Sequence, residues 1–427
     1  MRVNITEVDL FISYLSDSLN ADNLSLVEGI TTDSRDIQKN DLFLAIKGEN
    51  FDGSDFIDEA LSNGAIYVIT ESVHDSSNVF TVDNVIEFIG EICSKWMADF
   101  DGKTIAITGS NGKTTTKDLI SHILSKNGHN VSKTEGNFNT SIGVPLTIFS
   151  FSNEPSQIYV LEFGANQVGD IDYLSSIVKP DIGIVTNISG AHLEGFGSID
   201  NIRKEKKSIF NHSNKGYYGD EIDTSIILSN HPLANNKVFL KNASIAYEVC
   251  KDIIDKNDQE EFSRIIEDFV LPKGRGQTYS LSRGIVLIDD TYNANPESVK
   301  AAIDNLERHQ TKGRKLFIFG DMKELGENEI DFHKNIADYC EGKIDGIICY
   351  GSLAKNTFNN SKSIPLSLHF DNKDTLVTEV CSLLENDDII MLKGSRSMQL
   401  DSVAEDIKNH VKWTIKFVKK LTWIYHI

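Results

Sequence analysis

The chain has 427 residues, of which 63 are acidic and 42 basic, so its formal net charge at pH 7 is −21. This length predicts two or three domains, and the acidic balance argues against a nucleic-acid-binding protein, whose footprint would be a basic face. A hydrophobic content of 40% is typical of a globular protein.

Three blocks follow one another along the chain. Residues 1–97 alternate short strands and helices. The second block, 98–277, contains apolar strands at 104–108, 158–162 and 182–187. The third block, 278–412, contains strands at 285–289, 315–320, 346–351 and 389–393. Short apolar strands alternating with helical stretches predict doubly wound, parallel α/β sheets in the last two blocks.

The first strand of the second block runs into a glycine turn, a lysine and three threonines. Gly109 and Gly112 permit a tight turn that points N–H groups at an anion. Lys113 supplies a positive charge for β/γ-phosphates, and the Thr114 hydroxyl can ligate Mg²⁺. A helix predicted at 117–124 directs its positive end at the same phosphates. An ordinary strand–turn–helix corner is the alternative, but this pattern favours nucleotide binding.

Two further strands of this block end in candidate ligands. Glu162 ends the strand 158–162, where a carboxylate can hold the metal that bridges ATP phosphates. A helix cap or a surface position is the alternative. His192 lies in a glycine-flanked loop at the expected ligand edge, which favours a metal or phosphate role over the structural role usual for a lone histidine.

The charged run Arg203–Lys207 has two interpretations that the residues leave open. From charge alone it is a solvated helix face. Alternatively, one of its lysines works in neutral form near a metal, because buried lysines shift their pKa readily.

Polar loops of the third block are candidate contacts for nucleotide or substrate. Arg275, in the junction 273–276, can reach nucleotide phosphates. The segment 289–296 follows the block's first strand with many polar side chains. Residues 322–326, with His333 downstream, and 393–397 are candidate substrate loops.

The remaining features concern location. The cysteines (Cys93, Cys250, Cys340, Cys349 and Cys381) lack CxxC spacing, and we interpret them as reduced core residues of a cytoplasmic protein. We expect neither a signal peptide nor a transmembrane segment. The tail 413–427 contains three lysines and two tryptophans. One interpretation is a weak amphipathic contact with a membrane or a partner. We favour the alternative, a helix docked on the last domain or a poorly ordered end.

Together these motifs resemble those of the Mur ligases of peptidoglycan synthesis, over residues 30 to about 405. The phosphate-loop motif 108–115 is also shared with folylpolyglutamate synthetases. The segments 162–166, 191–198 and 289–296 resemble the member that adds D-alanyl-D-alanine. Asp33-Ser34-Arg35 and Asp41-Leu42-Phe43 resemble the UDP-binding N-terminal domain of that member and of the tripeptide-forming member.

The resemblance implies a three-domain α/β fold. The domains are a UDP-sugar-binding domain at 1–97, a central ATP-binding domain with a P-loop-type parallel sheet at 98–277, and a Rossmann-like domain at 278–412, before the tail. The implied activity is an ADP-forming ligation that activates the carboxylate of UDP-MurNAc-tripeptide as an acyl phosphate and joins it to D-alanyl-D-alanine, for cell-wall synthesis. These two small molecules are the expected partners of a monomer, with no nucleic acid.

The resemblance also implies roles for individual residues. The catalytic group is Lys113, Glu162, His192 and Lys206, of which Lys206 matches a carbamylated lysine. Two Mg²⁺ ions are expected on Thr114, Glu162, His192 and Lys206. ATP contacts are expected from Gly109, Ser110, Asn111, Gly112, Lys113, Thr114, Thr115, Asn242, Arg275 and Asp290. UDP-sugar contacts are expected from Ser34, Arg35, Asn137, Asn139 and Thr140, the last where a second Asn is more usual.

One segment departs from the family pattern. Residues 211–249 are much shorter than usual, with 241–246 as the remnant of a helix on the adenine side. In that register Asn242 matches one asparagine of the helix, and Phe239 replaces another. We therefore expect the central sheet to lack strands. Two alternatives stay open: the same chemistry on another substrate, as in folylpolyglutamate synthetases, or a non-catalytic nucleotide-binding relative.

Overall fold

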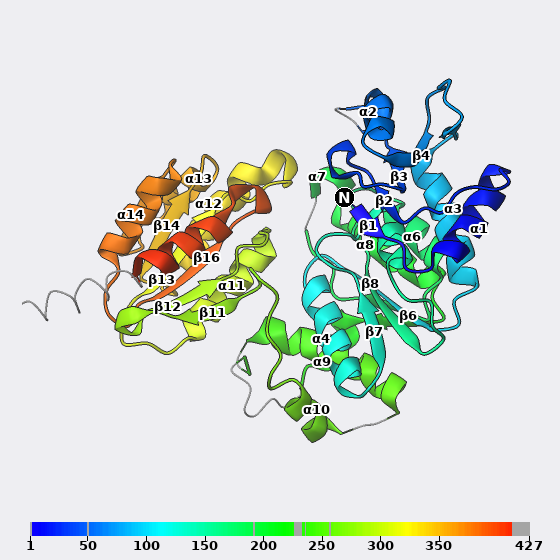
Figure 1. The fold of residues 1–427 in the computed structure, drawn as a ribbon. Coiled ribbons are helices and arrows are strands. Elements are labelled where there is room, and N and C mark those ends of the chain that lie inside the picture. The colour runs from blue at the N-terminus through cyan, green and yellow to red at the C-terminus, as the bar shows by residue number, and fades with distance from the viewer. Residues whose placement is uncertain are drawn as a thin grey trace, which may run out of the picture.

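The computed structural model describes residues 2–48, 51–190, 193–225, 233–234, 236–255 and 258–411. Its strands form three sheets, each flanked by helices (Figure 1). The tail 413–427 lies outside the described residues. None of the described helices combines the length and the apolar character needed to cross a bilayer.

The first sheet is formed by residues 2–81. Its strands are β1 (Arg2–Asn4), β2 (Gly29–Thr31), β3 (Asp41–Ala45), β4 (Ala65–Thr70) and β5 (Val79–Thr81), in that spatial order. Only β1 and β2 pair antiparallel. The accompanying helices are α1 (Val8–Leu19), α2 (Ile57–Ser62) and α3 (Val85–Ala98).

The second sheet is entirely parallel and has the order β10-β9-β6-β8-β7. Its strands are β6 (Lys103–Thr108), β7 (Asn130–Lys133), β8 (Gln157–Glu162), β9 (Ile182–Val185) and β10 (Lys215–Tyr218). Its helices are α4 (Lys113–Lys126), α5 (Gly143–Phe149), α6 (Asp170–Val178), α7 (Leu193–Phe196), α8 (Ile199–Lys207), α9 (Lys237–Ile254) and α10 (Gln259–Ile265).

Alternating side chains of β6 separate two cores. Ile105 and Ile107 face the core that contains residues of α4, α9 and α10. Ala106 faces the opposite core, which also contains residues of α3, α5 and α6. This alternation follows from the strand period of two and explains why the strand is apolar throughout.

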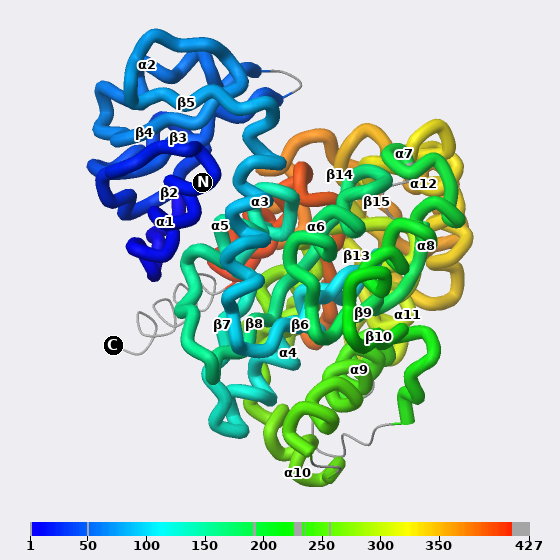
Figure 2. The backbone as a smooth tube through the Cα atoms, turned by 90° about the vertical axis from the view of Figure 1, so that its right-hand side faces the viewer, coloured from blue at the N-terminus to red at the C-terminus, as the bar shows by residue number. Residues whose placement is uncertain are grey.

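Helix α3 joins the first two sheets through one apolar core. Asn84 begins the helix by accepting a hydrogen bond from Glu87 N, and α3 then runs from the first sheet along α6 (Figure 2). The buried Trp96 ring of α3 lies 5.4 Å from Phe149 of α5, and Phe11 of α1 lies 5.0 Å from Phe149. The first two sheets therefore share a continuous core.

The third sheet has the order β11-β12-β16-β13-β14-β15, and only β11 runs antiparallel to its neighbour. The strands are β11 (Gln277–Ser280), β12 (Val286–Asp289), β13 (Lys315–Gly320), β14 (Gly346–Tyr350), β15 (Leu366–Phe370) and β16 (Ile389–Lys393). Helices α11 (Pro296–Arg308), α12 (Glu329–Cys340) and α13 (Ala354–Asn360) contribute to one core, and α14 (Lys373–Leu383) with the helical stretch 400–411 to another.

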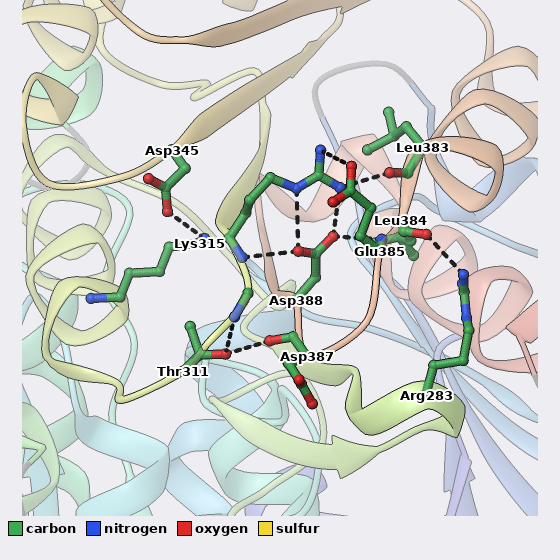
Figure 3. A network of polar contacts seen from close by, with 11 residues as sticks. Arg283, Thr311, Lys315, Asp345, Leu383, Leu384, Glu385, Asp387 and Asp388 are labelled. Carbon is green, nitrogen blue, oxygen red and sulfur yellow. Dashed lines mark hydrogen bonds and ion pairs between the residues drawn. The ribbon is translucent and has the colours of Figure 1, made fainter.

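A polar network lies at the end of this sheet where its parallel strands begin (Figure 3). The buried Asp388 carboxylate, just before β16, accepts hydrogen bonds from Arg314 Nη2 at 2.7 Å and from Arg314 N at 2.9 Å. Glu385 N donates to the same carboxylate at 2.8 Å, and Arg283 Nη1 donates to the Leu384 carbonyl at 2.9 Å. Since the buried Asp388 carboxylate finds all these donors at this end of the sheet, the network is structural.

The predicted α/β fold class is confirmed, and the predicted core position is confirmed for four of the five cysteines. The chain forms α/β layers with a parallel central sheet, and the predicted strands of both later sheets are present. All five cysteines are unpaired, and all but Cys381 are buried. In these two later sheets, the strands that were not predicted are β7, β10, β11 and β15.

Candidate active site

The phosphate loop between β6 and α4 requires both of its glycines. Gly109 has φ +143°, and a Cβ atom there would lie 2.0 Å from Thr186 Oγ1. Gly112 has φ +81°, and a Cβ atom there would lie 2.5 Å from Asn242 Oδ1. Any larger residue would meet both strain and a clash. Asn242 therefore packs on the loop, although it lies 130 residues further along the chain.

The helix after the loop begins at Lys113, four residues earlier than predicted. The prediction was wrong because the threonines do not delay the helix: Gly112 completes the turn, and Thr114, Thr115 and Thr116 form the first helical turn. The free N–H groups of that turn consequently lie at the loop itself, where they can meet an anion.

Lys113 is folded back over the loop. Its Nζ donates to the Gly109 carbonyl at 2.7 Å. Burial lowers the pKa of this lysine, the Glu162 carboxylate opposes that shift, and the Arg275 guanidinium adds to it. A bound phosphate would bring further negative charge and so favour the protonated form of this partly buried lysine.

Glu162 and Thr114 meet at the end of β8. Glu162 is 3% exposed, and its Oε2 accepts a hydrogen bond from Thr114 Oγ1 at 2.9 Å. Its Oε1 accepts from Asn139 Nδ2 at 2.9 Å. Carboxylate and hydroxyl oxygens are the ligands that Mg²⁺ prefers, so this pair fits a magnesium ion bound together with phosphates.

Arg275 connects this pair to the third sheet. Its Nη2 donates to Thr114 Oγ1 at 3.2 Å, and its guanidinium carbon lies 3.8 Å from the Tyr292 ring centroid. Within the part of the chain that is described, Arg275 Nε is buried without a hydrogen-bond partner. A phosphate oxygen would satisfy this donor.

The charged run in α8 divides between solvent and core. Arg203 and Lys204 are exposed, whereas Glu205 and Lys206 are 2% and 3% exposed. The Glu205 carboxylate accepts from Gly169 N and Ile171 N, both at 2.7 Å, and so fixes α8 to the start of α6. The solvated-face interpretation therefore fails at Glu205 and Lys206.

Lys206 is buried beside an aromatic ring. Its Nζ lies 5.4 Å from the Phe196 ring centroid. Burial lowers its pKa to about 7, helped by the positive charge of Lys113 and opposed by Glu205 and Asp170. An amine with this pKa is partly neutral near pH 7, which an ordinary lysine is not.

Two cavities lie between the second and third sheets. The larger, about 400 Å³, lies between α9 and α11, and its wall includes Asn236, Phe239, Asn242, Glu297, Ala301 and Asn305. The smaller, about 240 Å³, includes Glu162, Asn137, Asn139, Thr140, Asn166, Tyr292, Lys323 and Leu325. Asn111, Arg275 and Lys393 border both cavities.

Some of the predicted loop residues of the third sheet reach the cavities, and others do not. Lys393 is 3% exposed and donates to Asp290 Oδ2 at 2.7 Å. Lys323 lines the smaller cavity, so that part of the predicted loop 322–326 reaches the site. His333 is fully buried beneath this loop, and its Nε2 accepts from Met322 N at 3.0 Å. Burial lowers its pKa, so His333 supports the loop as a neutral side chain.

Family models cover most of the chain in three consecutive matches. Residues 26–98 match the Mur ligase family catalytic domain, 107–268 the Mur ligase middle domain, and 274–396 the Mur ligase glutamate ligase domain. The UDP-N-acetylmuramoyl-tripeptide–D-alanyl-D-alanine ligase of Bacillus subtilis is 30% identical over 90% of this chain and 93% of its own. The chain belongs to the Mur ligase family.

Further Mur ligases agree with this assignment. The ligase of the same name from Haemophilus influenzae is 30% identical over 93% of this chain and 97% of its own. The crystal structure of MurF from Acinetobacter baumannii superposes with a TM-score of 0.80 at 25% identity, over 93% of this chain and 98% of that one. MurF from Thermotoga maritima in complex with ADP gives 0.77 at 26% identity, over 90% and 98%.

The structure brings most of the predicted site residues together. Ser110, Asn111, Gly112, Lys113, Thr114, Glu162 and Arg275 surround the smaller cavity, and Thr115, Asn242 and Asp290 line the larger. Asn137, Asn139 and Thr140 also reach the smaller cavity. Ser34 and Arg35 lie in the first domain and line neither cavity. The predicted ligand His192 lies outside the described residues.

Two contacts at the site were not predicted from the sequence. Asn187 Oδ1 accepts from Asn111 N at 2.8 Å, and Asn295 Nδ2 donates to Asn111 Oδ1 at 2.8 Å. Asn295 precedes a proline after a strand, which is the signal of a helix start, but that signal gives no spatial neighbour. Across the described ranges, no three His, Cys, Asp or Glu side chains group as a metal site.

Proposed function

We propose that this Mur ligase joins D-alanyl-D-alanine to UDP-MurNAc-tripeptide at the expense of ATP, releasing ADP and phosphate. The proposal rests on the sequence similarity to ligases of that name, which are 30% identical over at least 90% of this chain. The phosphate loop, the Thr114–Glu162 pair and the two cavities supply a nucleotide site next to a second substrate site.

The chemistry begins with attack of the tripeptide carboxylate on the γ-phosphorus of ATP. The new carboxyl O–P bond forms as the bond to the β-phosphate oxygen breaks, giving an acyl phosphate and ADP. Lys113 and the first turn of α4 stabilise the charge on the transferred group. The dipeptide amine then attacks the acyl carbon, loses a proton and displaces phosphate.

Magnesium fits the oxygens of Thr114 and Glu162. When bound, it would neutralise phosphate charge during transfer. Asn139 holds the Glu162 carboxylate in place from the other side. Arg275, held over Tyr292, lines both cavities, and a phosphate oxygen would satisfy its unpartnered Nε.

We further propose that Lys206 carries a carbamate. Its neutral amine would attack CO₂, forming an N–C bond and losing a proton, and so convert a buried cation into an anion. The pKa of about 7 supports this step, because a protonated amine has no lone pair to react. The carbamate would offer oxygens to a second magnesium ion together with His192.

We assign a different substrate group to each domain of the chain. We assign the UDP group to the first domain, 1–97, through Ser34 and Arg35, and ATP to the central domain, 98–277. The third domain, 278–412, lines the larger cavity with Asp290 and the smaller one with Tyr292 and Lys323. Asn137, Asn139 and Thr140, which line the smaller cavity, would face the sugar and peptide. We place the enzyme in the cytoplasm as a monomer, and unpaired buried thiols suit that reducing compartment.

The two alternatives have less support. A bifunctional folylpolyglutamate synthase/dihydrofolate synthase from Yersinia pestis shares the fold at 15% identity, and this likeness is no argument that the two proteins share a substrate. A non-catalytic relative would be expected if the shortened segment had removed the adenine side. Instead α9 is an 18-residue helix, and its Asn242 packs against the phosphate loop.

Phosphate release from ATP and Mg²⁺ tests the proposal. We expect release that requires both UDP-MurNAc-tripeptide and D-alanyl-D-alanine, with one amide bond formed per phosphate. Lys113→Ala should lower the rate by about 10³-fold, because it removes a cation from the developing charge. Release with a folate substrate instead, or none despite binding of the UDP-sugar, would contradict the proposal.

A further inference from the structure

One side-chain hydrogen bond ties the phosphate loop to the third domain. Asn295 Nδ2 donates to Asn111 Oδ1 at 2.8 Å, across 184 residues of sequence. Asn111 lines both cavities, and Asn295 lines the smaller one, so the bond lies where the cavities adjoin. Asn295 itself is 9% exposed.

All four polar groups of Asn111 are engaged. Its backbone N–H donates to Asn187 Oδ1 at 2.8 Å, and its carbonyl accepts from Thr186 Oγ1 at 2.6 Å. Its side-chain Nδ2 donates to Ser189 Oγ at 3.1 Å. These three bonds hold the loop against the segment after β9, and the fourth group, Oδ1, is the one that reaches the third domain.

The Asn295 carboxamide is equally constrained. Its Oδ1 accepts from Ser298 N at 2.9 Å, and Asn295 N donates to Ser298 Oγ at 2.9 Å, which makes a capping box at the start of α11. Because the oxygen caps the helix, the amide nitrogen is the group that remains for Asn111. The orientation of both amides follows from their partners.

Helix α11 forms one wall of the larger cavity. Glu297, Ser298, Ala301 and Asn305 of this helix line it, opposite Phe239 and Asn242 of α9. The Asn111–Asn295 bond therefore sets the distance between the phosphate loop and the wall that closes over the nucleotide.

We propose that Asn295 is a positioning residue that docks α11 and the third domain on the phosphate loop through Asn111. This inference rests on the proposed ligase function. Docking keeps the nucleotide enclosed and keeps water away from the acyl phosphate. Without it, water attacks the acyl carbon, the C–O bond to phosphate breaks, and the tripeptide carboxylate and phosphate are regenerated without an amide bond.

Asn295→Ser tests docking with the helix cap retained. Serine caps helices about as well as asparagine but is too short to reach Asn111. The matched control is Asn372→Ser: Asn372 caps α14 of the same domain through Thr375 N at 3.0 Å and lines neither cavity. Both variants should unfold at nearly the same temperature.

We expect Asn295→Ser to raise the KM for ATP and the dissociation constant of a fluorescent ADP analogue about fivefold, the effect of one hydrogen bond. Phosphate released per amide bond should rise above one, whereas Asn372→Ser keeps the wild-type values. A purely structural role would lower the amount of active enzyme and leave this ratio unchanged.

Wild-type ADP affinity together with a ratio of one in Asn295→Ser would overturn the docking role. If the wild-type protein forms no amide bond at all, the proposed function fails, and ADP affinity alone decides the docking role. Weaker ADP binding in Asn295→Ser than in Asn372→Ser then supports it, and equal binding overturns it.

Discussion

The central domain meets its two neighbours in different ways. Toward the first domain, α3 packs on α5 and α6, and side chains such as Trp96 and Phe149 belong to one shared core. Toward the third domain, polar groups of the central domain make the contacts: Asn111 accepts a hydrogen bond from Asn295, and the Arg275 guanidinium lies over the Tyr292 ring. The third domain keeps two apolar cores of its own.

We therefore call the apolar interface with the first domain fixed and the polar interface with the third domain adjustable. A shared apolar core costs free energy wherever it is opened, because each exposed Å² loses about 25 cal/mol of hydrophobic stabilisation. Polar contacts can exchange with water or with ligand groups at much smaller net cost. We therefore expect the first two domains to move as one body, and the third to adjust around substrates.

The largest effect is expected from breaking the apolar interface. Trp96→Ala should lower the free energy of unfolding by about 4 kcal/mol, because a fully buried aromatic ring is replaced by a cavity. Peptides from both the first and the central domain should then exchange amide hydrogens faster, while peptides of the third domain do not. Hydrogen exchange read by mass spectrometry measures this.

A conservative change at the same position provides the control. Trp96→Phe keeps an aromatic ring against Phe149 and should cost clearly less stability than alanine. If Trp96→Ala loosened only residues 2–81, the core would not couple the two domains, and the fixed-interface interpretation would fail.

The second effect concerns Lys206, the buried lysine of α8. Lys206→Ala should lower ligation about 100-fold with little loss of stability, because the proposed carbamate can no longer form. Formate or acetate should restore part of the activity. Lys204→Ala, two residues earlier and exposed, is the matched control and should ligate normally.

The carbamate proposal also predicts in which direction the activity changes with pH. The pKa of Lys206 is about 7, so its amine is mostly protonated below that pH and mostly neutral above it. At limiting CO₂, wild-type activity should therefore rise as pH increases through 7. Activity that is independent of added bicarbonate, and full turnover by Lys206→Ala, would exclude the carbamate.

The smallest effect tests how closely α3 and α6 pack at the fixed interface. A Cβ atom at Gly90 of α3 would lie 1.9 Å from the Tyr173 hydroxyl of α6. Gly90→Ala should therefore cost about 1 kcal/mol, since the clash outweighs the better helix propensity of alanine. Adding Tyr173→Phe removes the clashing hydroxyl together with its hydrogen bond to the Ile86 carbonyl, so it should recover part of the loss. Stabilisation by Gly90→Ala alone would show that the two helices pack loosely.

The strands that sequence patterns missed share one position in the fold. β7 and β10 form the two edges of the central sheet, and β11 and β15 form the edges of the third. Edge strands pair on one side only and remain partly exposed, so they lack the continuous apolar run that identifies a buried strand. β11, for example, alternates half-buried and exposed residues.

The sequence by itself located the glycine loop between β6 and α4 and the positions of the buried strands along the chain. Glycines, lysine and threonines at fixed spacing, and apolar runs, are local signals that need no partner. Tertiary structure decided which lysine of the charged run is buried, that the first two domains share a core, and that Asn295 meets Asn111. Those outcomes depend on contacts between distant segments, because burial and hydrogen-bond partners are properties of the packed chain and not of its local pattern.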